Sequence, residues 1–302
     1  MQIGIDLGGT KIEAAVLDAA GAFVFRERVS TPQGDYPEIL QAISRIIKRA
    51  ETTLGNHCTK VGVGHPGSVN PADGRIRNAN STCLNGQTLQ QDLVDLLQRP
   101  VRLANDADCL ALSEAMDGAA QGSPSVFAVI LGTGVGGGFF VNGDLLQGPN
   151  GLAGEWGHNP LPITSTGEFP GPTCYCGQQG CIEAWLSGPA LVADYQRHNP
   201  DASTRDVPAL ITAATAGNIA AQAALNRHTA RLARSLAVII NAFDPDTIVL
   251  GGGVSQRPGL SADLCNALPA HVFLPVGTAL QTKIRLPAFG DSSGVRGAAR
   301  LY

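Results

Sequence analysis

Three of the seven cysteines in this 302-residue chain lie within eight positions, in the segment CYCGQQGC. Cys174, Cys176 and Cys181 are spaced as C-x-C-x4-C, which suits either a disulfide or a metal site. The chain begins MQIGIDLGG and shows neither the basic nor the apolar region of a signal peptide. We therefore expect a cytoplasmic protein, in which structural disulfides are rare, and the pattern favours a metal.

A closed tetrahedral zinc site needs a fourth ligand, and His158 is the nearest candidate upstream of the cysteines. Three thiolates and one imidazole are a suitable ligand set for Zn²⁺. The alternative is a group of buried free thiols in which GQQG is an ordinary turn. If His158 binds zinc through one ring nitrogen, its other N–H becomes a fixed donor for a substrate hydroxyl.

The segment LANDADC offers two carboxylates for acid–base chemistry. Asp106 directly follows Asn105 and the apolar run 101–105, whereas Asp108 falls in the first turn of the following helix. A carboxylate at a strand end can accept the proton of a hydroxyl nucleophile during phosphoryl transfer. Two other roles stay open here, because Asp106 can be a helix N-cap and Asp108 can simply favour the helix dipole.

Three glycine turns follow apolar runs and predict a nucleotide site. GIDLGGTK comes close to the Walker pattern, but Thr10 and Lys11 are in reverse order and the next segment reads as a strand. Such a turn can present backbone N–H groups to a phosphate, and Asp6 can hold Mg²⁺ through water. One turn alone could be a plain β-hairpin; three together favour a nucleotide between two lobes. The predicted nucleotide-binding residues are Gly4, Asp6, Gly8, Gly9, Thr10, Lys11, Gly132, Thr133, Gly134, Gly252 and Gly253.

The elements that must position these residues form a repeated pattern. A strand at 2–7, a glycine turn and a strand at 12–17 are echoed by VFAVIL, GTGVGGG and FFVNG from residue 126 onward. This order is typical of a duplicated α/β unit. The break GAAQGSPS suggests an N-terminal lobe over 1–120 and a C-terminal lobe over 121–290 that carries the zinc motif. A final helix at 291–302 is expected to return to the first lobe.

The composition suits a globular protein, because 44% of the residues are hydrophobic and 15% are charged. A formal net charge of −4 argues against a nucleic-acid surface. No run of 18 apolar residues occurs, so we expect no membrane span.

In order and spacing, these motifs resemble the sugar-kinase branch of the actin/hexokinase/Hsp70-like superfamily. Within it, AGEWGHNPLP followed by CYCGQQGCIE closely resembles the ROK family (repressors, open reading frames and kinases), from residue 3 to about residue 300. The resemblance implies an α/β fold of two ribonuclease H-like lobes with a cleft between them. It also implies structural Zn²⁺ on four matching residues, His158, Cys174, Cys176 and Cys181.

The same resemblance assigns roles to individual residues. It makes Asp106 the general base, since Asn-Asp stands at this point in ROK kinases. It implies sugar contacts at Gly67, Asn80, Asn105, Asp106, Glu155, His158 and Glu183. Two positions depart from the family: Asp108 stands where asparagine is expected, and His65 stands where an aliphatic residue is more usual. We assign no role to His65.

The predicted function is therefore an ATP-dependent hexose kinase that uses Mg²⁺. NANSTCLNGQ, EWGHNPLP and GDSSGVRGAA most resemble bacterial fructokinases that also act on mannose, which predicts phosphorylation at the 6-position. N-acetylglucosamine kinase and glucokinase of the same family are the alternatives. The expected partners are the sugar, ATP and a second copy of the chain in a homodimer, with no nucleic acid and no membrane.

A different class, the sugar-responsive ROK repressor, is disfavoured. Such repressors place a helix-turn-helix domain before the first Asp-x-Gly-Gly-Thr motif, which here begins at residue 6. A chaperone-type ATPase would lack both the cysteine cluster and the GEWGH motif.

Overall fold

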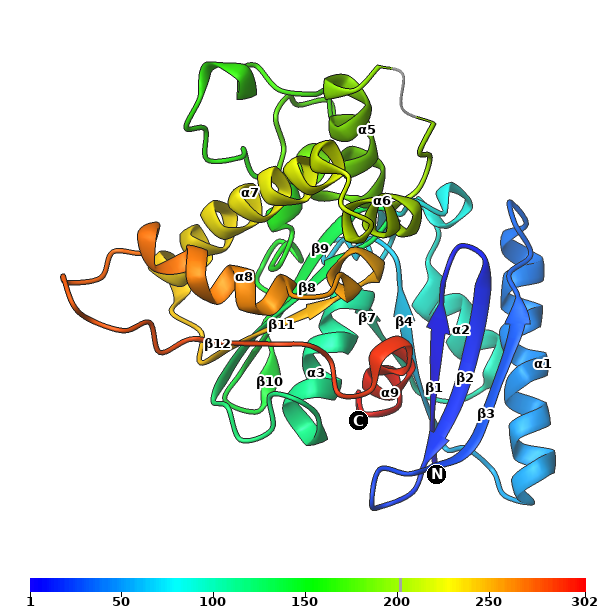
Figure 1. Cartoon of the computed structure of the whole chain (residues 1–302). Helices are drawn as coiled ribbons and strands as arrows, with labels where there is room; N and C mark the ends of the chain where they lie inside the picture. The colour runs from blue at the N-terminus through cyan, green and yellow to red at the C-terminus, as the bar shows by residue number, and fades with distance from the viewer. Residues whose placement is uncertain (201–202) are drawn as a thin grey trace. The chain divides into compact units, whose positions relative to one another are not determined.

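The first apolar runs of the chain form a five-stranded mixed sheet in the computed structural model, which describes residues 1–200 and 203–302 (Figure 1). Its strand order is β3-β2-β1-β4-β7, and β1 pairs antiparallel with β2 but parallel with β4. The strands are β1 (Gln2–Leu7), β2 (Lys11–Leu17), β3 (Phe23–Ser30), β4 (Lys60–His65) and β7 (Val101–Asn105). The predicted strands at 2–7 and 12–17 are thus confirmed.

A second five-stranded sheet repeats this order as β10-β9-β8-β11-β12, with β11 parallel to both β8 and β12. Its strands are β8 (Ser125–Leu131), β9 (Val135–Val141), β10 (Asp144–Leu145), β11 (Thr247–Gly251) and β12 (Lys283–Arg285). A short hairpin joins β5 (Ser68–Val69) to β6 (Ile76–Arg77). The equal strand order of the two sheets confirms the predicted duplicated α/β fold.

Nine α-helices lie in the described part of the chain. They are α1 (Tyr36–Leu54), α2 (Leu89–Leu97), α3 (Asp106–Asp117), α4 (Glu183–Leu186), α5 (Gly188–His198), α6 (Val207–Thr215), α7 (Ile219–Phe243), α8 (Leu260–Ala267) and α9 (Ser293–Ala299). None of these helices combines the length and the apolar composition that crossing a bilayer requires.

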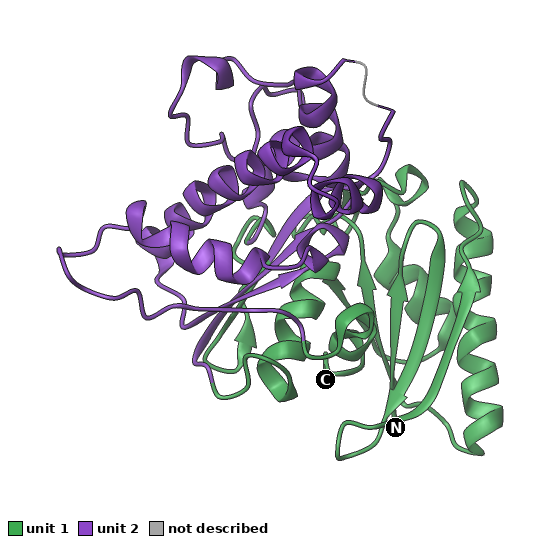
Figure 2. Ribbon diagram, in the orientation of Figure 1, with its two compact units in different colours: residues 1–122, 138–153, 288–302 green, residues 123–137, 154–287 purple. Residues whose placement is uncertain are grey.

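The chain divides into two compact units (Figure 2). Unit 1 comprises residues 1–122, 138–153 and 288–302, and unit 2 comprises residues 123–137 and 154–287. This is a finer division than the predicted 1–120 and 121–290. The segment 138–153 groups with unit 1 because Gly138 lies against the backbone of Ala107, where a Cβ would come within 2.6 Å of the carbonyl oxygen.

Unit 1 has helices on both faces of its sheet. α1 and α2 pack on the face that presents Val61 and Val63, whereas α3 and α9 cover the other face (Figure 1). Glycines allow α9 to approach closely, because a Cβ at Gly4 would lie 2.4 Å from Ala299 N and one at Gly62 would lie 1.9 Å from Ala298 O. The C-terminal helix is therefore part of the core of unit 1.

Helix α1 shows how the sequence specifies an element. The side chain of Asp35 accepts a hydrogen bond of 3.0 Å from Glu38 N–H and caps the N-terminus. Gly55 ends the helix with a φ of 60°, a left-handed conformation that favours glycine. Its buried apolar face consists of Ile39, Ala42, Ile43, Ile46, Ile47 and Ala50. These residues recur at the helical period and form one face of the helix.

Candidate functional site

Asp106 opens helix α3 directly after strand β7. Asn105 is the N-cap, and its Oδ1 accepts a hydrogen bond of 2.8 Å from Ala107 N–H. Oδ1 of Asp106 lies at the same distance from that N–H. Asp106 is therefore not the N-cap, and its carboxylate lies in the first turn of the helix, at the positive end of the helix dipole.

Gly67 joins Asp106 to a second predicted sugar segment within unit 1. Asn105 Nδ2 donates a hydrogen bond of 2.8 Å to Gly67 O. The φ of Gly67 is +78°, and a Cβ there would lie 2.7 Å from Ala79 N, so this close approach requires glycine. The exposed Asn80 follows directly. Unit 1 thus brings Gly67, Asn80, Asn105 and Asp106 together.

His65 ends strand β4 close to these residues. It is buried, and its Nδ1 donates a hydrogen bond of 2.9 Å to Pro66 O. Burial lowers the pKa of His65, so the ring is neutral near pH 7. His65 is therefore a buried side chain in the core of unit 1.

Asp6, at the end of β1, carries a strongly perturbed carboxyl group. Burial raises the pKa of Asp6 to about 7, and the negative charges of Asp106 and Glu13 add to the shift. Lys11 and Arg28 act in the opposite direction. An excess of negative charge at a buried carboxyl is a suitable environment for a divalent cation, so the donor set fits Mg²⁺.

We expect Asp6→Asn to stabilise the folded protein more at high pH than at low pH in Mg²⁺-free buffer. The pKa of Asp6 is about 7 when folded and 3.8 in its ordinary state, so between these values the folded chain binds more protons. The free energy of unfolding therefore falls as pH rises through this window. Because asparagine is neutral throughout, its gain should be about 2 kcal/mol larger at pH 8 than at pH 5.5.

Urea unfolding at the two pH values measures this difference. Asp18→Asn is the matched control, because Asp18 is exposed in a turn of the same unit. An equal effect of Asp6→Asn at both pH values would contradict the raised pKa.

The first glycine turn, residues 8–10, joins β1 to β2. Gly8 N–H donates to Lys11 O at 2.9 Å, and Thr31 Oγ1 donates to Gly8 O at 2.7 Å. Gly9 and Thr10 are exposed, which leaves this turn accessible to a phosphate. Lys11 Nζ lies 3.6 Å from an Asp291 carboxylate oxygen.

Gly4 has a different place from the one predicted. It is buried in the middle of β1, against the backbone of α9. The structure therefore corrects its assignment as a nucleotide contact: Gly4 is glycine because α9 leaves no room for a Cβ.

The second glycine turn lies in unit 2 and is tied to a predicted sugar residue. Gly132 N–H donates to Gly134 O at 2.9 Å, and Gly188 N–H donates to Gly132 O at 2.7 Å. A Cβ at Gly134 would lie 2.6 Å from Glu183 Oε2, whereas one at Gly132 would meet nothing closer than 4.0 Å. A side chain at Gly134 would therefore displace Glu183, and only Gly132 is free to be substituted without this effect.

The third glycine turn follows β11. Gly252 has a φ of +86°, and a Cβ there would lie 2.3 Å from Leu131 O at the end of β8. Around a Cβ at Gly253 there is open space. Gly252 is thus required by backbone packing, and Gly253 is the open position of the pair.

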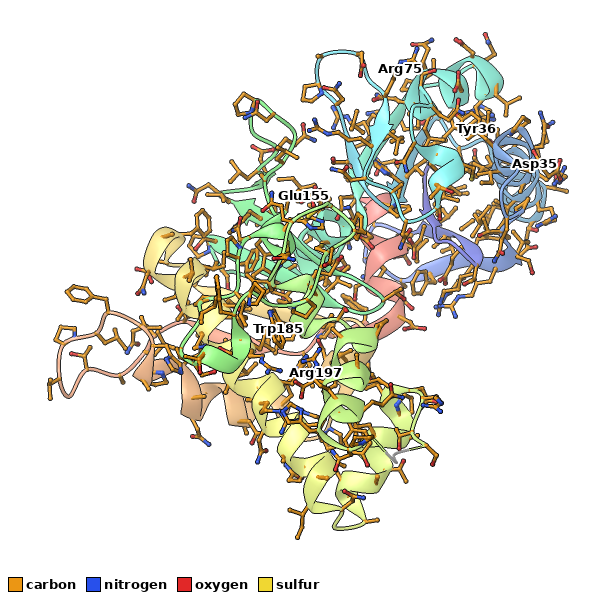
Figure 3. All side chains as sticks on the ribbon, turned by 90° about the horizontal axis from the view of Figure 1, so that it is seen from above. Asp35, Tyr36, Arg75, Glu155, Trp185 and Arg197 are labelled. Atoms are coloured by element: carbon orange, nitrogen blue, oxygen red, sulfur yellow. The ribbon has the colours of Figure 1, made fainter. Side chains whose placement is uncertain are left out.

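Strand β9 begins earlier than predicted, at Val135 rather than at the Phe139 of FFVNG. Bulky rings pack on one of its glycines: a Cβ at Gly137 would lie 2.7 Å from Trp156 Cδ1 and 2.8 Å from the Phe127 ring. Trp156 Nε1 also donates to Gly136 O at 2.9 Å. The indole therefore fixes the turn that carries the neighbouring Glu155 (Figure 3).

Glu155, His158 and Glu183 all lie near the start of β9 in unit 2. Glu155 is the residue before the 3-10 helix Trp156–His158, in which Gly157 packs so tightly that a Cβ would lie 2.1 Å from Val135 O. Glu183 opens α4, and its Oε2 accepts a hydrogen bond of 2.8 Å from Val135 N–H. Unit 2 thus brings these three predicted sugar residues together.

A buried cluster of charged and aromatic side chains anchors α4. The sequence analysis did not predict this cluster. The guanidinium of Arg231 lies 4.3 Å from the centre of the Trp185 ring and forms a salt bridge of 3.0 Å with Glu168. Arg197 lies 5.6 Å from the same ring (Figure 3). These contacts come from residues far apart in the sequence, so no local pattern predicts them.

The cysteine segment forms a tight hairpin. Cys174 N–H donates to Gln178 O at 2.8 Å, and Gly177, with a φ of +89°, makes the turn between them. A β-bridge pairs Cys181 with Pro160, next to the turn that carries His158. The hairpin thereby brings three thiols and one imidazole to the same point.

The geometry of this cluster fits zinc. The ligand atoms of His158, Cys174, Cys176 and Cys181 all lie within 4.8 Å of one another. Cys176 Sγ and Cys181 Sγ are 3.6 Å apart, close to the separation of about 3.8 Å that two sulfurs take at Zn–S bonds of about 2.3 Å. This distance is too long for a disulfide, and all three cysteines are free thiols. His158 Nδ1 lies 3.6 Å from Cys174 Sγ and is the nitrogen on the metal side.

Tyr175, between two of the cysteines, is a further candidate that the sequence reading did not assign. Its hydroxyl lies 3.1 Å from Nε2 of His158, and the two rings meet edge to face with centres 5.1 Å apart. Partial desolvation raises the pKa of Tyr175 to about 12, and the charges of Glu183 and Glu155 contribute. The only signal in the sequence is an aromatic residue inside the C-x-C pair.

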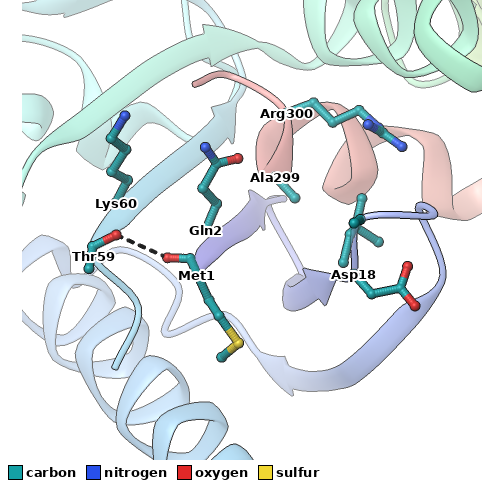
Figure 4. A pocket seen from close by; sticks show the side chains of 9 residues that line it. Met1, Gln2, Asp18, Thr59, Lys60, Ala299 and Arg300 are labelled. Atoms are coloured by element: carbon teal, nitrogen blue, oxygen red, sulfur yellow. Dashed lines mark hydrogen bonds between the residues drawn. The ribbon is translucent and has the colours of Figure 1, made fainter. Parts of the chain in front are cut away.

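A surface hollow of about 390 Å³ lies elsewhere in unit 1 (Figure 4). At its edge Thr59 Oγ1 donates to Met1 O at 3.4 Å. Its lining consists of Met1, Gln2, Leu17, Asp18, Ala19, Thr59, Lys60, Ala299 and Arg300. None of the predicted site residues is among them.

The comparisons with known proteins agree with this geometry. The model of the ROK family matches residues 2–302. An N-acetyl-D-glucosamine kinase of Yersinia pseudotuberculosis is 39% identical over 309 residues, which cover 100% of this chain and 99% of the relative. The crystal structure of a ROK hexokinase from Thermus thermophilus has a TM-score of 0.85 at 32% identity, covering 99% of this chain and 96% of its own. A ROK family glucokinase from Streptomyces griseus, in complex with glucose and AMPPNP, has a TM-score of 0.82 at 28% identity, covering 99% and 98%.

Proposed function

The chain belongs to the ROK family, and from that premise we propose that it is an ATP-dependent hexose kinase. One observation carries the proposal. Asp106 stands at a strand end on the first turn of α3, directly after Asn105, whose side chain donates to Gly67 O. A carboxylate at a strand end can accept the proton of a sugar hydroxyl, and this supports Asp106 as the general base.

In this proposal Asp106 accepts the proton of the sugar hydroxyl as that oxygen attacks the γ-phosphorus of ATP. The carboxylate lies at the N-terminus of α3, and Asn105 caps that helix beside it. The glycine turns at 8–10 and 132–134 would present backbone N–H groups to the phosphates of ATP, and the turn at 252–253 would let the backbone lie flat against the adenine ring. Mg²⁺ would be held by Asp6 through water and would neutralise charge on the phosphates.

The sugar hydroxyls would contact the side chains that each unit brings together. Glu155 and Glu183 supply acceptors, Asn80 supplies an amide, and His158 supplies an N–H whose direction is fixed when its other nitrogen binds zinc. Bound zinc would act as a structural cross-link of the hairpin and would take no part in the transfer itself. The predicted homodimer and the cytoplasmic location belong to this proposal.

N-acetyl-D-glucosamine is the acceptor that the curated relatives support, because the relative that is 39% identical over the full chain bears that activity in its name. Fructose, with mannose, is a second candidate. The resemblance of NANSTCLNGQ, EWGHNPLP and GDSSGVRGAA to fructokinases favours it, but the relatives named above do not. A few pocket contacts, each giving about 10- to 200-fold discrimination, decide between such acceptors.

Initial rates with ATP and each of N-acetylglucosamine, fructose, mannose and glucose test the proposal. We expect kcat/KM to be highest for N-acetylglucosamine by at least about tenfold. A tenfold preference for fructose would instead select the second candidate. ATP-dependent phosphorylation of none of the four would contradict the hexose-kinase proposal.

A further inference from the structure

His158 presents its two ring nitrogens to different partners. Nδ1 faces the thiols, 3.6 Å from Cys174 Sγ, and Nε2 lies 3.1 Å from the Tyr175 hydroxyl. A histidine that gives one nitrogen to a metal carries its proton on the other. With zinc on Nδ1, Nε2–H would be the donor and the Tyr175 oxygen would accept.

The surroundings of the Tyr175 hydroxyl match those expected for a sugar hydroxyl. It accepts from His158, and Glu155 and Glu183 lie close enough for their charges to act on it. A phenolic hydroxyl, like a sugar hydroxyl, accepts one hydrogen bond and donates another. His158, which is proposed to contact the sugar, thus lies within hydrogen-bond distance of this tyrosine hydroxyl, and Glu155 and Glu183 act on the hydroxyl through their charges.

The Tyr175 side chain can also rotate away from His158. Its backbone is held in the hairpin between Cys174 and Cys176, but its side chain is 68% exposed. Rotation about the side-chain bonds would move the hydroxyl away from His158 with little loss of buried apolar surface. The interactions lost would be the hydrogen bond to Nε2 and the edge-to-face contact of the two rings.

We propose that the Tyr175 hydroxyl is hydrogen-bonded to His158 Nε2 in the sugar-free protein, and that a hexose hydroxyl displaces it when the sugar binds to this nitrogen. This inference rests on the proposed sugar contact of His158. Tyr175 is then a competitor built into the sugar site, and it lowers the affinity for every hexose that uses this nitrogen.

Tyr175→Phe tests the inference, because phenylalanine keeps the ring and removes only the hydroxyl. Losing a competing hydrogen bond of ordinary strength should lower Kd for the best acceptor, measured by calorimetry without ATP, by about 2- to 10-fold. KM should fall in parallel while kcat stays within about twofold. Zinc content should stay equal to that of the wild type, which shows that the hairpin is intact. Tyr302→Phe, in unit 1, is the control and should change neither constant.

Two results would overturn the inference in an active enzyme. An unchanged Kd in Tyr175→Phe would mean that the hydroxyl does not compete. A raised Kd would make Tyr175 a sugar contact instead of a competitor. A wild-type protein that phosphorylates no hexose is a separate result; it would overturn the proposed function, and this inference with it.

Discussion

Replacing Asp106 by asparagine should lower kcat by about 10²- to 10⁴-fold while the Kd for the hexose changes by no more than a few-fold. Asparagine keeps the size of the side chain and can still accept from Ala107 N–H, which Asp106 approaches at 2.8 Å. It cannot accept a proton at neutral pH. The loss should therefore appear in the transfer step, measured as ATP-dependent sugar phosphorylation, with binding followed by calorimetry.

Asp108→Asn is the matched control, because it makes the same chemical change two residues further along the same helix α3. Asparagine is also the residue that the family resemblance leads one to expect there. We predict a kcat within a few-fold of wild type. If Asp108→Asn abolished transfer and Asp106→Asn did not, the base would be Asp108.

Removing one zinc ligand should destabilise the protein and lower its metal content together. Cys176 is the most informative ligand to remove because it is exposed, so Cys176→Ser removes little packing. We expect about one Zn²⁺ per wild-type chain and much less in the variant. The free energy of unfolding should fall by roughly 3 kcal/mol or more, a fraction of the 10–16 kcal/mol that zinc binding contributes in small zinc-finger peptides.

Elemental analysis and chemical denaturation measure the two effects, and Cys265→Ser is the control. Cys265 is likewise an exposed free thiol, on α8 in the same unit, but it lies outside the cluster. Full zinc occupancy in Cys176→Ser, or a Cys174–Cys181 disulfide in freshly purified wild type, would contradict the zinc site.

The local hydrophobic pattern of the sequence predicted the elements whose residues interact mainly with their sequence neighbours. The apolar runs of β1 and β2 gave their positions to within one residue. The start of β9 was misplaced because glycine usually weakens a strand, whereas here the rings of Trp156 and Phe127 occupy the space above it. Gly4 was misassigned for a similar reason, since α9 lies almost 300 residues away.

The zinc ligands could be proposed from spacing, because thiols and imidazole at such intervals have few other uses. The contact of Tyr175 with His158 could not, since it depends on the hairpin that folds the segment back. The separate grouping of Gly67 with Asn105, and of Glu183 with Val135, likewise depends on strand ends that meet only in the fold. The choice of hexose depends on a few contacts of this kind, and sequence motifs do not specify them. The motifs alone favoured fructose, whereas the full-length relatives support N-acetylglucosamine.

The most direct test of the kinase proposal follows the γ-phosphorus of ATP by ³¹P NMR with Mg²⁺ and the best acceptor of the four. We predict that ADP and a hexose phosphate form in equal amounts, and that neither forms when the hexose is left out. Release of the γ-phosphorus as inorganic phosphate, at a rate that does not depend on the hexose, would contradict the account.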